Sequence, residues 1–307
     1  MSVLVIGGTG MIGRHVVQGL VAKGEPVQVL TRSADRVDAL PCEARGIMGD
    51  LRKPETLRGA MKGVDRVFLV TSLSPTETEE GLAAVAASNY VGVRHLVYLS
   101  AHHAERTPHI PHFKSKAEIH KALRDSGMPF TLIMANNLFQ NDLAYRESIL
   151  EKGIYPQPIG GIGLNRVDVR DVADAAVVAL TQTGHEFRCY PLIGVERLGG
   201  HDVADIYSLF LGREIHYGGN DLETWENTTG RTLPGWKTYN LKLMYEVYQR
   251  YELLASDKDF VLQEQVLDHL PRSFHTFVRE TVMAWEQERP YGQTAMRQGE
   301  EERLVIG

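Results

Sequence analysis

The chain has 307 residues, of which 43% are hydrophobic and 23% charged, and its net charge near neutral pH is −6. This composition is that of a globular protein, and it lacks the basic footprint of a nucleic-acid-binding protein. No apolar run approaches the ~20 residues that a membrane span needs. The two cysteines, Cys42 and Cys189, lie far apart and fit a reducing compartment. We therefore expect a cytoplasmic protein that acts on a small molecule, with no nucleic-acid or membrane partner, and with a homodimer as one candidate assembly.

Short apolar runs alternate with amphipathic stretches through the first half of the chain. The predicted strands are residues 3–6, 27–30, 44–48, 67–70, 95–99 and 130–134. The predicted helices are residues 11–23, 54–61, 76–89 and 112–126, with a capping box formed by Thr76 and Glu79 at the third of them. Strands and helices that alternate at this spacing predict a parallel, doubly wound α/β sheet. The strands are apolar throughout, as expected where helices cover both faces.

Glycines mark the turn from the first strand into the first helix. Gly8, Gly10 and Gly13 match G-x-G-x-x-G, and Gly7 adds a second register of the same kind. Such a turn brings bare backbone against a pyrophosphate, and the helix that follows directs its free N–H groups at the phosphates. The residues expected to contact the dinucleotide here are Gly7, Thr9, Gly10, Met11, Ile12 and Gly13. A tight turn that binds nothing is the alternative interpretation.

The end of the second predicted strand indicates which dinucleotide is bound. NAD-binding proteins place an acidic residue near this point to bind the ribose hydroxyls. Here the acid is absent and Arg32 follows the strand instead. A guanidinium pairs with the 2′-phosphate of NADP, so we predict NADP(H) as the cofactor. Asp50 and Leu51, after the third strand, are expected near the adenine, although Asp50 also suits ordinary turn chemistry.

Several of these segments together resemble one family. They are Val-Ile-Gly-Gly-Thr-Gly-Met-Ile-Gly at 5–13, Thr-Arg-Ser at 31–33, Gly-Asp-Leu at 49–51, Val-Tyr-Leu-Ser at 97–100 and His-Phe-Lys-Ser-Lys-Ala-Glu at 112–118. The chain is similar to the NmrA-like family of atypical short-chain dehydrogenase/reductases over most of residues 1–195, and more faintly at 270–274. That family includes NADPH-dependent quinone and azo-type reductases and regulators that only sense the cofactor. The resemblance implies a Rossmann fold and NAD(P)H binding, and it leaves both functions open.

The resemblance also directs attention to the helix at 112–126. Short-chain reductases carry a Tyr-x-x-x-Lys pair there, and the matching residues in this chain are His112 and Lys116. Lys116 is expected to bind the nicotinamide ribose. Residues four apart share a helix face, so His112, Lys116 and then His120 are expected to face the cleft. His112 is a candidate proton donor, because imidazole titrates near neutral pH. Two alternatives remain: positioning alone suffices for hydride transfer, or the missing tyrosine means that no catalysis occurs.

Further cleft residues are expected where the parallel strands end, because ligands bind at the carboxyl ends of such strands. Ser100, or a residue one or two positions later, would orient the substrate. The fourth strand leads to Thr71, Ser72 and Leu73 beside the nicotinamide ribose. The expected substrate contacts are His102, His103, Asn136, Asn137 and Phe139. Relatives often carry Arg-Pro where this chain has Ala135 and Asn136, so the substrate class does not carry over.

The loop with His102, His103, His109 and His112 matches no standard metal spacing, and we predict no metal. Residues 1–150 are expected to form the NAD(P)-binding Rossmann core. Residues 151–307 would complete that core and add a smaller, mainly helical substrate lobe that is not an independent domain. Within it, residues 199–290 look mostly helical, with a short strand at 214–217. The sequence thus predicts an NADPH-dependent reductase of quinones, imines, enones or carbonyls, or alternatively a sensor of NADP(H) that binds a protein partner.

Overall fold

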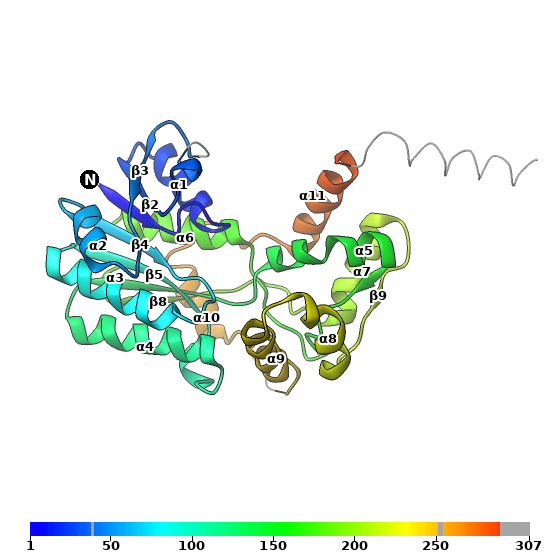
Figure 1. Cartoon of the computed structure of the whole chain (residues 1–307). Coiled ribbons are helices and arrows are strands. Elements are labelled where there is room, and N and C mark those ends of the chain that lie inside the picture. The colour runs from blue at the N-terminus through cyan, green and yellow to red at the C-terminus, as the bar shows by residue number, and fades with distance from the viewer. Residues whose placement is uncertain (38–39, 251–253, 289–307) are drawn as a thin grey trace, which may run out of the picture.

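A parallel sheet forms the centre of the molecule in a computed structural model that describes residues 1–37, 40–250 and 254–288 (Figure 1). The sheet order in these ranges is β3-β2-β1-β4-β5-β6-β8, and every neighbouring pair is parallel. The strands are β1 (Val3–Ile6), β2 (Val27–Thr31), β3 (Ala44–Met48), β4 (Arg66–Val70), β5 (His95–Ala101), β6 (Phe130–Ala135) and β8 (Arg188–Leu192). The order reverses at β1 and β4, which is where doubly wound sheets bind their ligands. The predicted Rossmann fold is confirmed.

Helices cover both faces of the sheet (Figure 1). On one face, α1 (Gly13–Ala22) packs beside α6 (Val169–Thr181), and their apolar sides bury Val3 and Val5 of β1. On the other face lie α2 (Pro54–Met61), α3 (Glu77–Val91) and α4 (Pro111–Ser126), which cover Leu4 and Ile6. All four side chains of β1 are buried because they alternate between two covered faces. The strands are therefore apolar throughout because helices cover both faces of the sheet.

Strand β8 is the element of the sheet that the sequence pattern did not predict. It begins with the charged Arg188 and contains Pro191, and both features argue against a central strand. In the structure β8 pairs with β6 alone, at the edge of the sheet. A proline at an edge loses no ladder hydrogen bond to a second neighbour. The edge position therefore explains why a strand exists where the local sequence discourages one.

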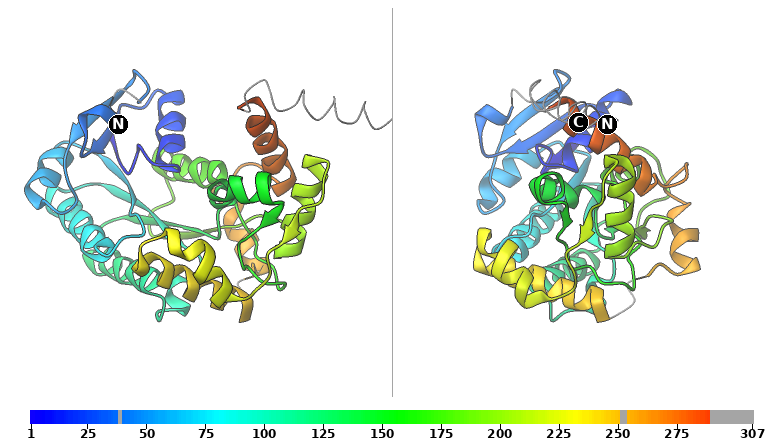
Figure 2. Two further views of the ribbon diagram at one scale, coloured as in Figure 1. Left: turned by 45° about the vertical axis from the view of Figure 1, so that its right-hand side comes forward. Right: turned by 90° about the vertical axis from the view of Figure 1, so that its right-hand side faces the viewer.

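Most of the remaining elements gather at one end of the sheet as a mainly helical lobe (Figure 2). They are η3 (Phe139–Tyr145), α5 (Arg146–Lys152), β7 (Ile154–Tyr155), α7 (Gly200–Leu211), β9 (His216–Tyr217), α8 (Leu222–Thr228), η4 (Thr229–Thr232), α9 (Gly235–Arg250) and α11 (Phe274–Gln287). Helix α10 (Asp257–Gln263) packs instead beside the edge strand β8. The short strands β7 and β9 pair with one another. The end of the region expected to be helical, at 289–290, and the rest of 289–307 lie outside the described residues. No helix within the described ranges has both the length and the apolarity to cross a membrane.

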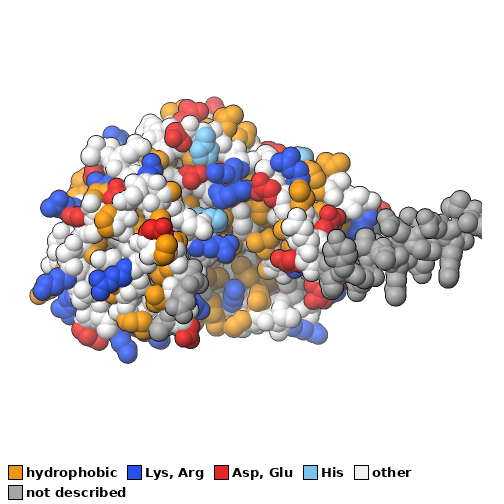
Figure 3. Space-filling model, turned by 90° about the horizontal axis from the view of Figure 1, so that it is seen from above, with side chains coloured by type: hydrophobic (Ala, Val, Ile, Leu, Met, Phe, Trp, Pro, Cys, Tyr) orange, Lys and Arg blue, Asp and Glu red, His pale blue; other side chains and the backbone are white. Residues whose placement is uncertain are grey.

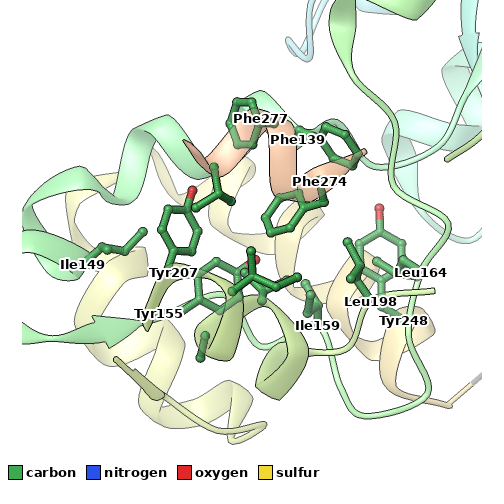
Figure 4. Close-up of a cluster of buried hydrophobic side chains, with 14 of the residues drawn as sticks. Phe139, Ile149, Tyr155, Ile159, Leu164, Leu198, Tyr207, Tyr248, Phe274 and Phe277 are labelled. Carbon is green, nitrogen blue, oxygen red and sulfur yellow. The ribbon is translucent and has the colours of Figure 1, made fainter. Parts of the chain in front are cut away.

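Aromatic side chains fill the core of this lobe (Figure 4). Phe139 packs against Phe274 and Phe277, with ring centroids 5.0 and 5.6 Å apart. Tyr155 and Tyr207 lie on the other side of the cluster, with ring centroids 6.3 Å apart. Phe139 is only 1% exposed, so its expected place in the substrate cleft is wrong. The chain turns at η3 directly after β6, and this turn directs the Phe139 ring into the lobe.

A fully buried ion pair lies beside these rings. Two nitrogens of Arg166 donate to the two carboxylate oxygens of Asp142 at 2.7 and 3.1 Å, and neither side chain is exposed. Gln157 donates to the same carboxylate at 2.8 Å, and Tyr155 does so at 3.3 Å. Arg166 also donates to Asn137 Oδ1 at 2.9 Å. Since Asn137 lines a cleft described below, the pair connects the lobe core to that cleft.

Candidate active site

A first cavity, of about 560 Å³, opens at the carboxyl ends of β1 and β2. Its lining includes, of the residues predicted to bind the dinucleotide, Gly7, Thr9, Gly10, Met11, Ile12, Gly13, Arg32, Asp50, Leu51 and Ser72. Further lining comes from Ser33, in the Thr-Arg-Ser segment, and from Arg36 and Glu80, which the sequence reasoning did not single out. The two arginines place positive charge at the end of the cavity where β2 ends. The structure thus brings the predicted residues of this cavity together.

The glycine loop is shaped by contacts that leave no room for side chains. Gly7 has a φ of +84°, a left-handed conformation that favours glycine, and Gly10 N–H donates to Gly7 O at 2.9 Å. A Cβ at Gly13 would lie 2.1 Å from Gly7 O and 2.7 Å from Gly8 Cα. The helix can therefore begin close against the loop, with the N–H groups of its first turn directed at the cavity. These residues fit a dinucleotide pyrophosphate.

Asp50 takes part in turn chemistry at the cavity, and its place near the adenine stays a prediction. It lines the cavity, and its carboxylate accepts a hydrogen bond from the backbone N–H of Arg52 at 3.0 Å. That backbone bond is the main cause that holds the pKa of Asp50 below its usual range, and the charges of Arg52 and Arg32 act in the same direction. Turn chemistry therefore fixes an ionised carboxylate at the rim of the cavity.

A second cavity, of about 540 Å³, lies between the sheet and the helical lobe and shares Ile12 and Val70 with the first. We call this second cavity the substrate cleft. Seen from above, the surface is hollowed between the two parts of the molecule, and hydrophobic and basic side chains surround the hollow (Figure 3). The predicted residues that line the cleft are Thr71, Leu73, Ser100, His102, His112, Lys116, Asn136 and Asn137. The lobe adds apolar and aromatic lining that the sequence reasoning missed, including Tyr145, Leu233, Leu241, Met244, Tyr245 and Tyr248.

A compact polar cluster forms the wall of the substrate cleft below α4. His112 Nδ1 lies 2.6 Å from Glu77 Oε2, and Lys116 Nζ lies 3.0 Å from Glu77 Oε1. Thr71 donates to Glu77 Oε1 at 2.9 Å and accepts from Lys116 Nζ at 3.0 Å. The Tyr98 hydroxyl lies 3.2 Å from Thr71 Oγ1. The two predicted residues of α4 are thus joined through a buried glutamate that the sequence reasoning did not identify.

The charges of this cluster balance one another. Burial acts to raise the pKa of Glu77, but the hydrogen bond with His112 and the charge of Lys116 outweigh it, so the pKa is lowered. Burial acts to lower the pKa of Lys116, while Tyr98 and Glu77 more than reverse this effect. Glu77 is therefore a carboxylate and Lys116 an ammonium ion at neutral pH. With Nδ1 bonded to Glu77, the other ring nitrogen of His112, Nε2, is left for the substrate cleft.

Glu77 was hidden by an error about the start of α3. The predicted capping box of Thr76 and Glu79 is absent: Thr76 is the N-cap but makes no side-chain cap bond, and its hydroxyl donates to Glu80 at 2.7 Å. Glu77 is the first residue of the helix and is 1% exposed. A glutamate in a helix's first turn usually complements the dipole at the surface. Glu77 is buried because α4 packs beside α3, and this packing could not be predicted from the local sequence.

Two further histidines differ from their expected positions. His120 is 2% exposed and does not line the substrate cleft; it bonds Ser100, which does. His103 also lies off the cleft, and its ring is tilted by 35° against that of His102 with ring centroids 3.6 Å apart. Its positive φ of 60° turns the chain away after His102. Burial lowers the pKa of His102 to about 4, with the neighbouring His103 acting in the same direction, so this cleft residue is neutral.

The fold and the paired cavities define a class: a dinucleotide-binding protein with a separate cleft next to the cofactor position. The model of the NmrA-like family matches residues 1–274, and the chain belongs to this family. It is 36% identical over 236 residues to an NAD(P)H azoreductase from Xenophilus azovorans, which covers 76% of this chain and 82% of the relative. It is also 36% identical over 217 residues to a (4-alkanoyl-5-oxo-2,5-dihydrofuran-3-yl)methyl phosphate reductase from Streptomyces griseus, covering 70% of this chain and 76% of the relative.

Solved structures agree on the fold. The NADPH-dependent quinone oxidoreductase from Escherichia coli, determined with NADPH, superposes with a TM-score of 0.83 at 21% identity. The match covers 91% of this chain and 99% of the other. The family predicted from the sequence motifs is confirmed.

Proposed function

We propose that this protein is an NADPH-dependent reductase that transfers hydride to a small electrophilic acceptor: a quinone, azo compound, imine, enone or carbonyl. One observation carries the proposal: the dinucleotide cavity and the substrate cleft meet at Ile12 and Val70, so a cofactor in one reaches an acceptor in the other. The relatives at 36% identity are named as reductases, which supports the same chemistry. Bound NADPH would supply the hydride.

The residues of the substrate cleft suit distinct tasks. Lys116 is fixed by Glu77 and Thr71, and we assign it to the nicotinamide ribose together with Ser72 and Leu73. His112 Nε2 would hydrogen-bond the acceptor, because Glu77 fixes the ring through Nδ1. Ser100 lines the cleft at the end of β5 and would face the acceptor. The helical lobe would close over the acceptor and exclude water with its apolar side chains.

The lining also limits the substrate class. Tyr145, Tyr245 and Tyr248 offer aromatic faces, and Leu241 and Met244 add apolar surface. Polar groups gather on the sheet side of the cleft, at Asn136, Asn137 and His102. This division favours a flat, mainly apolar acceptor whose one polar end is directed at the strand ends.

The test is NADPH consumption, followed by absorbance, against a panel of quinones, azo compounds, imines, enones and aldehydes. We expect turnover with at least one acceptor class. Replacing His112 by alanine should lower kcat/KM by about tenfold, the value of one hydrogen bond to the acceptor. Lys114→Ala is the matched control, because Lys114 lies on the same helix with its side chain 64% exposed.

An outcome of tight NADPH binding without turnover on any acceptor would contradict this proposal and favour an NADP(H) sensor that acts on a protein partner. Two further points stay predictions of the sequence. A cytoplasmic location is tested by cell fractionation, and a homodimer is tested by sedimentation of the purified protein.

A further inference from the structure

A chain of hydrogen bonds leads from the substrate cleft to the protein surface. Ser100 Oγ, at the end of β5, lies 2.5 Å from Nε2 of His120 on α4. Nδ1 of the same imidazole lies 3.1 Å from Oε1 of Glu105. Glu105 belongs to the short helix η2 (Ala104–Arg106), which follows β5. Residues from three elements thus form one continuous path.

Burial along this path is greatest in its middle. Ser100 lines the substrate cleft, His120 is 2% exposed, and the side chain of Glu105 is 47% exposed. Arg124 donates to the same Glu105 oxygen at 2.7 Å and fixes the outer end. One end therefore meets the substrate position, the other meets solvent, and an imidazole with two proton-carrying nitrogens connects them.

Two other buried histidines, His95 and His185, do not share this arrangement. His95 bonds Thr131 at 2.8 Å, and Thr131 in turn donates to a backbone carbonyl, so that path ends inside the sheet. His185 bonds Tyr190 at 2.9 Å without reaching either cavity. These bonds satisfy buried polar groups. His102 also lines the substrate cleft, but its Nε2 lies 3.7 Å from the nearest oxygen of Asp259, whose side chain is only 19% exposed. Among the described residues, only the Ser100–His120–Glu105 path connects a cavity to an exposed carboxylate by hydrogen bonds through a buried histidine.

We propose that Ser100, His120 and Glu105 form a proton relay that supplies the acceptor with the proton it needs after hydride transfer. The inference rests on the proposed reductase function, because that reaction leaves the acceptor with a negative charge on oxygen or nitrogen. Ser100 touches the acceptor and is the catalytic residue of the relay. His120 and Glu105 act through it.

Each turnover moves one proton inward along the relay. The Ser100 hydroxyl gives its proton to the reduced acceptor, and Ser100 Oγ takes the proton of His120 Nε2. The Glu105 carboxylate takes a proton from solvent and passes it to His120 Nδ1. Four bonds to hydrogen break and four form, and one solvent proton is consumed. His120 is then protonated at Nδ1, and it returns to the Nε2-protonated tautomer before the next turnover. No oxidant or further reductant takes part.

The charges around His120 suit a carrier rather than a fixed ion. Burial acts to lower its pKa, the Glu105 carboxylate acts to raise it, and the positive charges of Arg124 and Lys116 lower it again. Tyr98 meets the imidazole edge-on, with ring centroids 6.1 Å apart. The net result is a lowered pKa, so a proton that reaches His120 is readily passed on.

The decisive experiment compares single turnovers of the whole protein, using an acceptor that the wild type reduces. His120→Gln, Glu105→Gln and Ser100→Ala are the relay variants, and Ser100→Thr retains a hydroxyl. Glu118→Gln is the matched control, because Glu118 lies on the same helix as His120 and its side chain is 43% exposed. NADPH affinity and thermal unfolding are measured for each variant to confirm an intact cofactor site.

We expect His120→Gln and Ser100→Ala to lower the rate by about 100-fold, as for loss of a general acid, with a smaller loss for Glu105→Gln. In these variants the solvent isotope effect should rise and the isotope effect of 4-deuterated NADPH should fall, because proton transfer becomes limiting. Ser100→Thr should restore most of the rate. An iminium acceptor, which needs hydride but no proton, should be reduced by the variants at the wild-type rate.

Three results would overturn the relay. The variants could turn over as the wild type does, they could lose activity equally toward iminium and neutral acceptors, or they could lose it with both isotope effects unchanged. The last two identify a purely structural role. A wild type that binds NADPH but reduces nothing overturns the proposed function and the relay with it, whereas normal turnover in the variants overturns the relay alone.

Discussion

The two halves of the molecule build their part of the site by opposite means. In the sheet half, bare backbone forms the dinucleotide cavity: Gly7 turns left-handed and Gly13 lies against it. In the helical lobe, buried side chains form the structure around the cleft. The pair of Asp142 and Arg166 joins residues 24 positions apart, and Arg166 also bonds Asn137 in the substrate cleft. The cofactor cavity therefore depends on local chain geometry, whereas the cleft depends on long-range burial.

The largest effect is expected where a side chain invades the glycine loop. Gly13→Ala puts a Cβ 2.1 Å from Gly7 O and should weaken NADPH binding by on the order of 100-fold or more. Gly10→Ala should cost less, because its Cβ would lie 3.2 Å from the same oxygen. Gly59→Ala in α2, with nothing within 4 Å, is the control and should bind normally. Calorimetric titration with NADPH ranks the three, and equal affinities would show that the loop is not the cofactor site.

The lobe should respond in stability rather than in cofactor affinity. Asp142→Asn leaves the Arg166 guanidinium charged and fully buried, so we expect the free energy of unfolding to fall by about 3–5 kcal/mol. The matched control is Asp125→Asn at an exposed pair with Lys121, where no measurable change is expected. Urea unfolding followed by tryptophan fluorescence measures both. A loss no larger than that of the control would mean that the lobe does not depend on this pair.

This contrast also explains what could be predicted from the sequence. The Rossmann order, the glycine loop and Arg32 follow from patterns within a few residues, and the structure places them as predicted. Strand β8 was missed because its arginine and proline argue against a central strand. They are compatible with an edge strand, but the edge position is known only from the assembled sheet. The successful predictions each relied on a pattern of neighbouring residues in the sequence.

The substrate cleft shows more clearly which contacts could not be predicted from the sequence. Lys116 and His112 were identified because they match the family's Tyr-x-x-x-Lys spacing, but Glu77, which joins them, lies on another helix and 35 residues before His112. Helical spacing also placed His120 in the cleft, although its ring turns into the sheet toward Ser100. Phe139 was expected in the cleft and lies in the core instead. Side-chain direction and helix packing decide these contacts, and neither follows from spacing along one element.

Acid should affect the stability of the two halves differently, because the sheet buries neutral imidazoles and the lobe buries an ion pair. Burial lowers the pKa of His95 to about 4 from an unfolded value near 6.5. The unfolded chain thus binds more protons between these values, and stability that is complete above pH 6.5 is lost as the pH falls toward 4. The full effect is on the order of 3 kcal/mol. His102, with the same pKa of about 4, adds a similar slope.

Urea unfolding across this pH window tests the assignment. His95→Gln keeps a hydrogen-bonding group for Thr131 but cannot ionise, so its stability should fall less steeply with acid than that of the wild type. His216→Gln, at a histidine whose side chain is 67% exposed, should retain the wild-type slope. Parallel curves for wild type and His95→Gln would show that the imidazole of His95 accepts its proton in the folded protein as freely as in the unfolded chain.

The smallest expected effect is on the preference of the sheet half for NADPH over NADH. Arg32 and Arg36 line the cavity at the end of β2, where a 2′-phosphate would lie, and Arg32 is solvent-exposed. Because water screens an exposed charge, Arg32→Ala should raise the Kd for NADPH by only about 10- to 30-fold and leave the Kd for NADH unchanged. Arg45→Ala, at an exposed arginine of β3 outside the cavity, should alter neither constant. If NADH and NADPH weaken together, Arg32 holds the shared part of the dinucleotide and the preference for NADP lies elsewhere.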